Sequence, residues 1–174
     1  MDSSVFQSFF KISLNLIIHF NIIILQGLLN KTDWNLICLD RLDFSGNLNR
    51  IADMLKDKAS SVRRRLKYVW VDLRSPITEA AASDIGKVDY ILHLAAGSHV
   101  DRSIEYPMEF VWDNVVGTVN LLEFARKFQP NLDRFVYFST DEVFGPAPRG
   151  KPPTNILYSL DINLFHLRSL LRRV

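Results

Sequence analysis

Four short apolar runs, separated by segments of helical periodicity, constrain the fold of this chain most strongly. They cover residues 34–40, 67–72, 89–95 and 134–140, and each is apolar on both faces. Strands of this kind that alternate with helices are typical of a parallel sheet covered on both sides. The sequence therefore predicts an α/β fold with a Rossmann-like, doubly wound parallel sheet.

Helical periodicity fills the intervals between the runs. It is clear over residues 47–58, and Ser75 followed by Pro76 predicts a helix start, with Ser75 as the N-cap. The longest predicted helix covers residues 107–128, and a further one falls within residues 155–174. The long helix has two adjoining apolar stripes: Val111, Val115, Thr118, Leu122 and Ala125, and then Phe110, Gly117, Leu121, Phe124 and Phe128. One stripe is enough to cover a sheet, so the second indicates either a partner subunit's helix or burial within the same chain.

Residues 12–30 differ from the rest of the chain because they carry no formal charge. The run is nearly long enough to span a bilayer, but the polar residues Ser13, Asn15, His19, Asn21 and Gln26 interrupt it. No basic start or small-residue cleavage site marks it as a signal peptide. Three interpretations of this run remain open: a membrane anchor, a buried strand or helix, and sequence that is foreign to the fold.

Overall composition narrows the function classes. A formal charge of +2 is too small to suggest a nucleic-acid binder. The single cysteine, Cys38, excludes an internal disulfide framework and a cysteine zinc site, and it fits the cytoplasm. The four histidines are too scattered to predict a metal site.

Small or acidic residues follow all four predicted strands, at the edge where doubly wound sheets bind ligands. They are Asp40; Asp72 and Leu73; Ala95, Ala96, Gly97 and Ser98; and Ser139, Thr140, Asp141 and Glu142. An acid at the position of Asp40 can accept hydrogen bonds from a ribose diol and disfavours a 2′-phosphate. The pattern predicts a nucleotide pocket, although an aspartate after a strand is also a common turn starter.

Thr140, Asp141 and Glu142 form the most chemically specific group. Adjacent carboxylates repel, so their pKa values should split, which suits one as a general acid and the other as a general base. A threonine hydroxyl beside them can hydrogen-bond a carbonyl. A solvated acidic loop is the alternative interpretation.

The segments HLAAGSHVDRSIEYPMEFVWDNVVGTVNLLEFAR and RFVYFSTDEVFG resemble the nucleotide-sugar 4,6-dehydratases of the extended short-chain dehydrogenase/reductase superfamily. The dTDP-glucose type is the most similar, and CLDRLDFSGNL extends the resemblance, which covers residues 27–154. It implies an NAD-binding Rossmann domain, a smaller sugar-nucleotide domain, and a homodimer that pairs through the helix at 107–128.

The resemblance also implies residue roles. Asp40 would bind the adenosine ribose, Asp72 and Leu73 the adenine, and Ala95 and Ala96 would line the NAD. Ser98, His99, Arg102 and Ser139 would lie near cofactor and substrate, and Asn114 would support the site. With dTDP- or UDP-glucose as substrate, Thr140 would polarise the sugar, Asp141 would protonate the leaving hydroxyl, and Glu142 would take the C5 proton.

Several family features are absent from this sequence. Only Gly27 precedes Gly46, so the glycine-rich turn that holds pyrophosphate is replaced, although NIIILQG at residues 21–27 could imitate the first strand. Ile162 stands where the lysine of the family's Tyr-x-x-x-Lys pair should follow Tyr158. The substrate domain is missing too.

We therefore expect an incomplete Rossmann-like domain at residues 27–154, between divergent segments at 1–26 and 155–174. The alternatives are a non-catalytic remnant or gene-model fragment that pairs with full-length subunits, and a nucleotide-sugar epimerase of the same superfamily. The Asp141–Glu142 pair favours a dehydratase.

Overall fold

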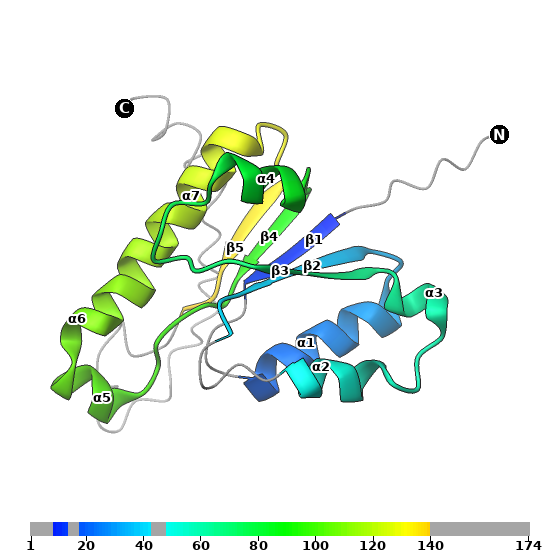
Figure 1. Ribbon diagram of the computed structural model, residues 1–174, viewed down its shortest axis with the longest axis horizontal. Helices are drawn as coiled ribbons and strands as arrows, with labels where there is room; N and C mark the ends of the chain where they lie inside the picture. The colour runs from blue at the N-terminus through cyan, green and yellow to red at the C-terminus, as the bar shows by residue number, and fades with distance from the viewer. Residues whose placement is uncertain (1–8, 14–17, 43–47, 140–174) are drawn as a thin grey trace, which may run out of the picture.

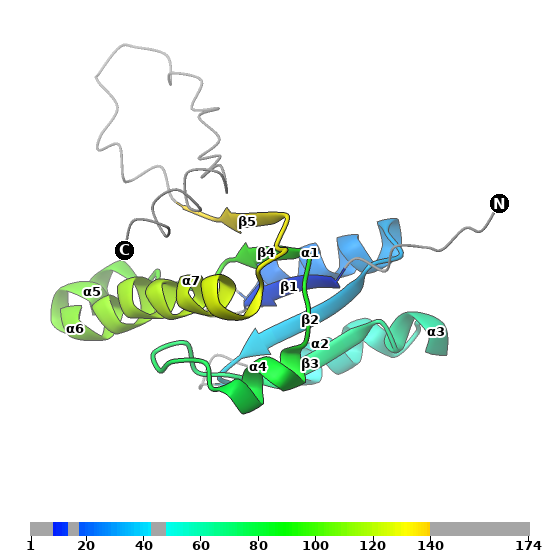
Figure 2. The same cartoon turned by 90° about the horizontal axis from the view of Figure 1, so that it is seen from above.

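The computed structural model describes residues 9–13, 18–42 and 48–139. Within them a parallel five-stranded sheet has the order β3-β2-β1-β4-β5 (Figure 2). The strands are β1 (Phe9–Ser13), β2 (Asn35–Asp40), β3 (Leu66–Trp70), β4 (Tyr90–His93) and β5 (Arg134–Tyr137). The predicted doubly wound parallel sheet is confirmed, and β2 to β5 lie within the four apolar runs or one residue from them.

Helices cover both faces of this sheet. They are α1 (Ile18–Lys31), α2 (Leu48–Leu55), α3 (Ser60–Arg63), α4 (Glu79–Ile85), α5 (Val100–Glu105), α6 (Pro107–Phe110) and α7 (Gly117–Phe128), with the π-helical η1 (Val111–Val116) between α6 and α7. Figure 1 shows α1 and α2 on one side of the sheet and α4 and α7 on the other. The predicted long helix at 107–128 is thus a continuous α6–η1–α7 rod. No helix among the described residues is long and apolar enough to cross a membrane.

Two buried clusters follow from strands that are apolar on both faces. On the α4/α7 face, Ile37 and Leu39 of β2 join Ile91, Leu121 and Phe124 in one cluster. On the α1/α2 face, the alternate β2 residues Leu36 and Cys38 pack with Leu25, Leu29 and Leu92. Burial lowers the acidity of the Cys38 thiol by raising its pKa well above the usual value, so this cysteine is an inert core residue.

The first strand is not where the sequence suggested. Residues 21–27 are helical within α1, because Leu25 and Leu29, one turn apart, are both buried against the sheet. The central position is filled instead by β1, which pairs with β2 and β4. Residues 14–17, which join β1 to α1, have the sequence Leu-Asn-Leu-Ile and contain no glycine.

The predicted helix start at Ser75 and Pro76 is also wrong. The helix α4 begins at Glu79, and its N-cap is Thr78, whose Oγ1 accepts a hydrogen bond from the Ala81 amide at 3.2 Å. Ile77 is buried at 8% exposure, so the chain is held against the core before the helix can begin.

Both predicted stripes of the α6–η1–α7 rod reach the core over α7, but one of them is exposed at its start. Gly117, Leu121 and Phe124 of one stripe and Ala125 of the other are buried, whereas Val111 and Val115 are 42% and 56% exposed. The widened π-helical turn lies at the transition between the exposed and the buried parts of the rod.

Candidate functional site

The strand registers bring the carboxyl ends of the sheet to one edge. Asp40 of β2 is the register partner of Trp70 in β3, and His93 of β4 is the partner of Tyr137 in β5. Ser13 at the end of β1 pairs with Leu39 on one side and with His93 on the other, so all five strands end at nearly the same level. The segments that follow β2, β3, β4 and β5 therefore start side by side. This is the edge at which doubly wound sheets bind ligands.

A cleft of ≈ 460 Å³ opens at this edge, between the strand ends and the α6–η1–α7 rod. Its lining residues are Arg41, Trp70, Asp72, Arg74, Gly97, His99, Arg102, Glu109, Phe110 and Asp113. Three arginines, three carboxylates and two aromatic rings therefore meet around one cavity. Such a lining can stack a planar base and hydrogen-bond a polar ligand.

Each arginine of the cleft is paired with one of its carboxylates. Arg41 Nη1 lies 2.6 Å from Asp113 Oδ1, and Arg102 Nη2 lies 2.9 Å from Glu109 Oε2. Arg74 binds Asp72 with both Nε and Nη2, at 2.5 to 3.0 Å. This hydrogen bonding by Arg74, more than the nearby charge of Arg41, holds the pKa of the Asp72 carboxyl below its usual value.

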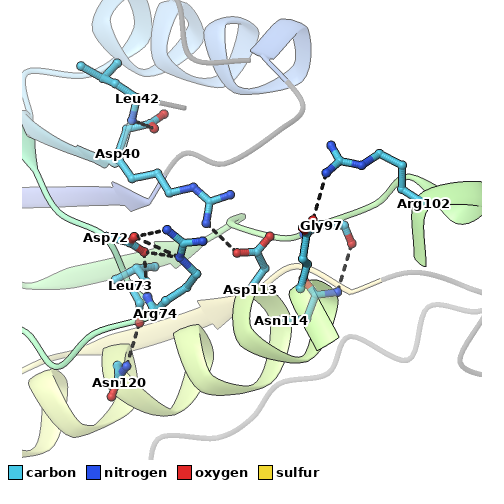
Figure 3. A network of polar contacts seen from close by, with 12 residues as sticks. Asp40, Leu42, Asp72, Leu73, Arg74, Gly97, Arg102, Asp113, Asn114 and Asn120 are labelled. Carbon is cyan, nitrogen blue, oxygen red and sulfur yellow. Dashed lines mark hydrogen bonds and ion pairs between the residues drawn. The ribbon is translucent and has the colours of Figure 1, made fainter. Parts of the chain in front are cut away.

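Asn114 of η1 fixes the backbone at the cleft. Its Oδ1 accepts a hydrogen bond from the Gly97 amide at 2.6 Å, and its Nδ2 donates to the Gly97 carbonyl at 3.0 Å (Figure 3). A Cβ on Gly97 would lie 2.9 Å from the Phe110 ring, so only glycine fits here without displacing that ring. The segment after β4 is therefore held tightly against the rod.

A second asparagine fixes the segment after β3. Asn120 Nδ2 donates to the Leu73 carbonyl at 2.8 Å, and Gly117 approaches Leu73 so closely that an added Cβ would lie 3.4 Å from its Cβ. The side chain of Leu73 is buried at 4% exposure. The rod thus positions the backbone on two sides of the cleft through amide side chains.

His93 links this arrangement to the core. The Thr118 hydroxyl donates to the Asn114 carbonyl at 2.6 Å, so its oxygen accepts the 2.8 Å hydrogen bond from His93 Nε2. The proton is therefore on Nε2, while the buried Nδ1 has no partner within the described part of the chain. Burial lowers the pKa of His93 to about 4, so the ring is neutral at pH 7.

The predicted cofactor residues are distributed unequally around the site. Asp72 lines the cleft, Leu73 is fixed by Asn120, and Ala95, Ala96 and Ser98 follow β4, with Ser98 exposed. Asp40 lies at the end of β2, where its Oδ1 accepts a hydrogen bond from the Leu42 amide at 2.8 Å. Ser139 is exposed beyond β5, and the predicted catalytic residues Thr140, Asp141 and Glu142 lie outside the described residues.

Sequence reasoning missed the charged residues that shape the cleft. The sequence pattern singles out none of Arg41, Arg74 and Asp113. Arg74 could have been found as a cation two residues after Asp72 in a turn. Asp113 gave no such signal, because its partner Arg41 is 72 residues away in the sequence. Within the described ranges, no group of three His, Cys, Asp or Glu could hold a metal ion.

Comparison with known proteins gives concordant matches. A family model described as GDP-mannose 4,6 dehydratase matches residues 24–155. The dTDP-glucose 4,6-dehydratase of Escherichia coli is 36% identical over 132 residues, which are 72% of this chain and 35% of the relative. The dTDP-D-glucose 4,6-dehydratase of Dictyostelium discoideum is 33% identical over 110 residues, or 63% and 24% of the two chains. The chain thus spans about a third or less of the length of these relatives.

Solved structures agree with the observed fold. DesIV, a dTDP-glucose 4,6-dehydratase from Streptomyces venezuelae crystallised with NAD, has a TM-score of 0.65 at 32% identity, covering 83% of this chain and 43% of DesIV. The UDP-Glc/GlcNAc 4-epimerase of Campylobacter jejuni has a TM-score of 0.64 at 24% identity. The match covers 95% of this chain and 48% of the epimerase, and it shows a shared fold.

Proposed function

Because this chain belongs to the GDP-mannose 4,6 dehydratase family, we propose that it serves NAD-dependent 4,6-dehydration of a nucleotide hexose. The observation that carries the proposal is the strand-end edge, where Asp40 ends β2, and Asp72 and Gly97 follow β3 and β4 beside the cleft. The substrate class is dTDP- or UDP-glucose, since the matching relatives from Escherichia coli and Dictyostelium discoideum are named for dTDP-glucose.

The described residues fit the adenosine half of NAD. The carboxylates of Asp40 and Asp72 can accept hydrogen bonds from a ribose diol and an adenine amino group, respectively. Trp70 and Phe110 line the cleft with rings on which a purine can stack. When bound, NAD⁺ would accept a hydride from C4 of the hexose and return it to C6.

The proton transfers are assigned to the residues that follow β5 in the sequence. Glu142 takes the proton from C5 and returns it to C5 in the last step, and Asp141 gives a proton to the C6 hydroxyl, which leaves as water. The proton of the C4 hydroxyl passes to solvent water, from which Asp141 regains its proton. Thr140 donates a hydrogen bond to the oxygen on C4. The roles follow from the family motif STDEVFG and from the different tasks that two adjacent carboxyls can perform.

The test is an incubation of the purified chain with NAD⁺ and dTDP-glucose or UDP-glucose, followed by NMR of the sugar. The proposal expects a 4-keto-6-deoxy product with at least one substrate. Glu142→Gln should slow its formation by about 100- to 10,000-fold, as for loss of a general base. Absence of product in the wild-type chain, with NAD⁺ shown to bind, would contradict catalysis by this chain alone.

We also propose that the chain forms a homodimer through the helix at 107–128. Supporting this, one side of the rod exposes large apolar side chains: Met108, Val111, Trp112, Val115 and Val119, each at least 42% exposed. Exposed patches of this kind mark interaction sites. Val115→Glu should convert a dimer into a monomer in analytical ultracentrifugation, whereas Ile23→Glu, at an equally exposed site on α1, should leave the dimer intact. A monomeric wild-type chain would contradict the proposal.

The same surface supports a second candidate function, a non-catalytic subunit that pairs with a longer homologue. Ile162 at the position expected for the family's lysine favours it. Co-expression with a full-length dTDP-glucose 4,6-dehydratase would test it: a mixed dimer sensitive to Val115→Glu supports this role, and separate elution contradicts it. We place either form in the cytoplasm, where the thiol of Cys38 would stay reduced.

A further inference from the structure

An ion pair crosses the cleft at the level of the β2 end. Arg41 follows β2 directly, Asp113 belongs to η1, and their closest atoms are 2.6 Å apart. The two side chains are only 11% and 14% exposed. Because burial removes both charges from water, each compensates the other, and the hydrogen bond helps to hold the guanidinium in position.

The two residues after Leu39 carry opposite signals about the nucleotide. Asp40 is the acid that accepts hydrogen bonds from a ribose diol and repels a 2′-phosphate. Arg41 is the type of residue that accommodates a 2′-phosphate, because its planar fork matches phosphate oxygens as well as a carboxylate. The sequence around β2 therefore does not decide between an adenine nucleotide with a free 2′-hydroxyl and one with a 2′-phosphate.

The charges around Arg41 favour a nucleotide with a free 2′-hydroxyl. Arg41 Nη1 donates a hydrogen bond to Asp113 Oδ1, and the positive charge of Arg41 is also near enough to Asp72 and Arg74 to interact with both. Figure 3 shows Asp113 facing the paired Asp72 and Arg74. The four groups form a set of two cations and two anions with no net charge to attract a phosphate.

Resting on the proposed nucleotide site, we propose that Asp113 determines which adenine nucleotide binds. By holding Arg41 across the cleft, Asp113 withholds the guanidinium from the ribose, so the site prefers a free 2′-hydroxyl to a 2′-phosphate. Loss of the carboxylate releases Arg41 toward the ribose edge and admits the 2′-phosphate. Asp113 is thus a specificity-determining residue on the rod, far in sequence from the acid after β2.

The test compares the binding of 5′-AMP and adenosine 2′,5′-bisphosphate by isothermal titration calorimetry. Wild type should prefer 5′-AMP. Asp113→Asn, which keeps the side-chain shape without the charge, should raise the affinity for the bisphosphate relative to 5′-AMP by about tenfold, the value of one charge-assisted hydrogen bond. The double variant Asp113→Asn/Arg41→Gln should lose that gain, because the guanidinium that contacts the phosphate is gone.

Glu123→Gln is the matched control, because it removes the same charge and releases Arg126 on α7, outside the lining of the cleft, so it should leave the ratio of the two affinities unchanged. Asp113→Ser provides a second neutral variant if Asp113→Asn does not fold. An unchanged ratio in a folded Asp113 variant would overturn this inference while the nucleotide site stands. Failure of the wild-type chain to bind 5′-AMP would instead overturn the proposed function.

Discussion

The two faces of the sheet are built for different tasks. On the α4/α7 face, amide side chains reach into the segments after the strands, as Asn114 does to Gly97 and Asn120 to Leu73. On the α1/α2 face, the buried residues are apolar, and Arg65 binds carbonyls at the end of α1. This face also contacts the strand-end edge through the Tyr68 hydroxyl, which donates to the Asp40 carbonyl at 3.0 Å. The α4/α7 face therefore positions the segments that line the cleft, and the α1/α2 face completes a core and supports the end of β2.

The largest expected effects compare one core side chain from each face. Phe124→Ala on α7 should destabilise the chain by about 3–5 kcal/mol, and Leu25→Ala on α1 by about 2–5 kcal/mol, because both leave cavities. Urea unfolding measures the loss. At urea concentrations where both variants are still folded, the affinity for 5′-AMP should fall for Phe124→Ala and stay unchanged for Leu25→Ala. An equal fall for Leu25→Ala would contradict the proposed difference between the two faces.

His93, which packs on the α4/α7 face, should make the free energy of unfolding depend on pH. Its pKa is lowered from 6.5 to about 4, so the folded chain favours the neutral ring. The stabilisation is complete above pH 6.5 and is lost as the pH falls toward 4, by about 3 kcal/mol for the whole shift. Unfolding free energies of wild type and His93→Gln, measured from pH 7 to 4, should diverge by this amount, since glutamine can still donate to Thr118. Parallel curves would count against a neutral buried His93.

Asn114→Ala removes both hydrogen bonds to Gly97 and should cost about 1–3 kcal/mol, because backbone groups at the cleft lose their partner. It should also weaken 5′-AMP binding measured by calorimetry. Lys58→Ala is the counterpart on the other face, where Lys58 Nζ donates to Asn30 Oδ1 at an exposed site. Its cost should stay within about 0.5 kcal/mol. Similar costs for the two variants would contradict the assignment of Asn114 to the site.

A smaller effect than that of Asn114→Ala is expected for Arg65, whose guanidinium donates to the carbonyls of Leu29 and Thr32 at the end of α1. Arg65→Met should lower the midpoint of thermal unfolding, for a loss of about 1–2 kcal/mol, because cations stabilise helix C-termini. Nucleotide affinity should not change. A variant that unfolds as wild type but binds 5′-AMP more weakly would mean that the α1/α2 face also shapes the cleft.

Local pattern predicted much of this architecture. The apolar runs located β2 to β5, because strands buried on both faces need continuous apolar sequence. Of the acids and small residues that follow them, Asp72 and Gly97 line the cleft, and their part in ligand binding stays a prediction. Residues 21–27 were misread because a continuous apolar run has no period that separates a strand from a helix. The pairing of Arg41 with Asp113 depends on tertiary packing across 72 residues and has no local signature.

In the proposed cofactor site, the strand-end edge beside the α6–η1–α7 rod would bind the adenosine half of NAD. An NMR titration of the ¹⁵N-labelled chain with NAD⁺ tests it most directly, because each backbone amide reports separately. The account predicts shifts at residues 72–74 and 95–98, competed by 5′-AMP, with residues 56–63 beyond α2 unchanged. Absence of shifts, or shifts confined to the α1/α2 face, would contradict it.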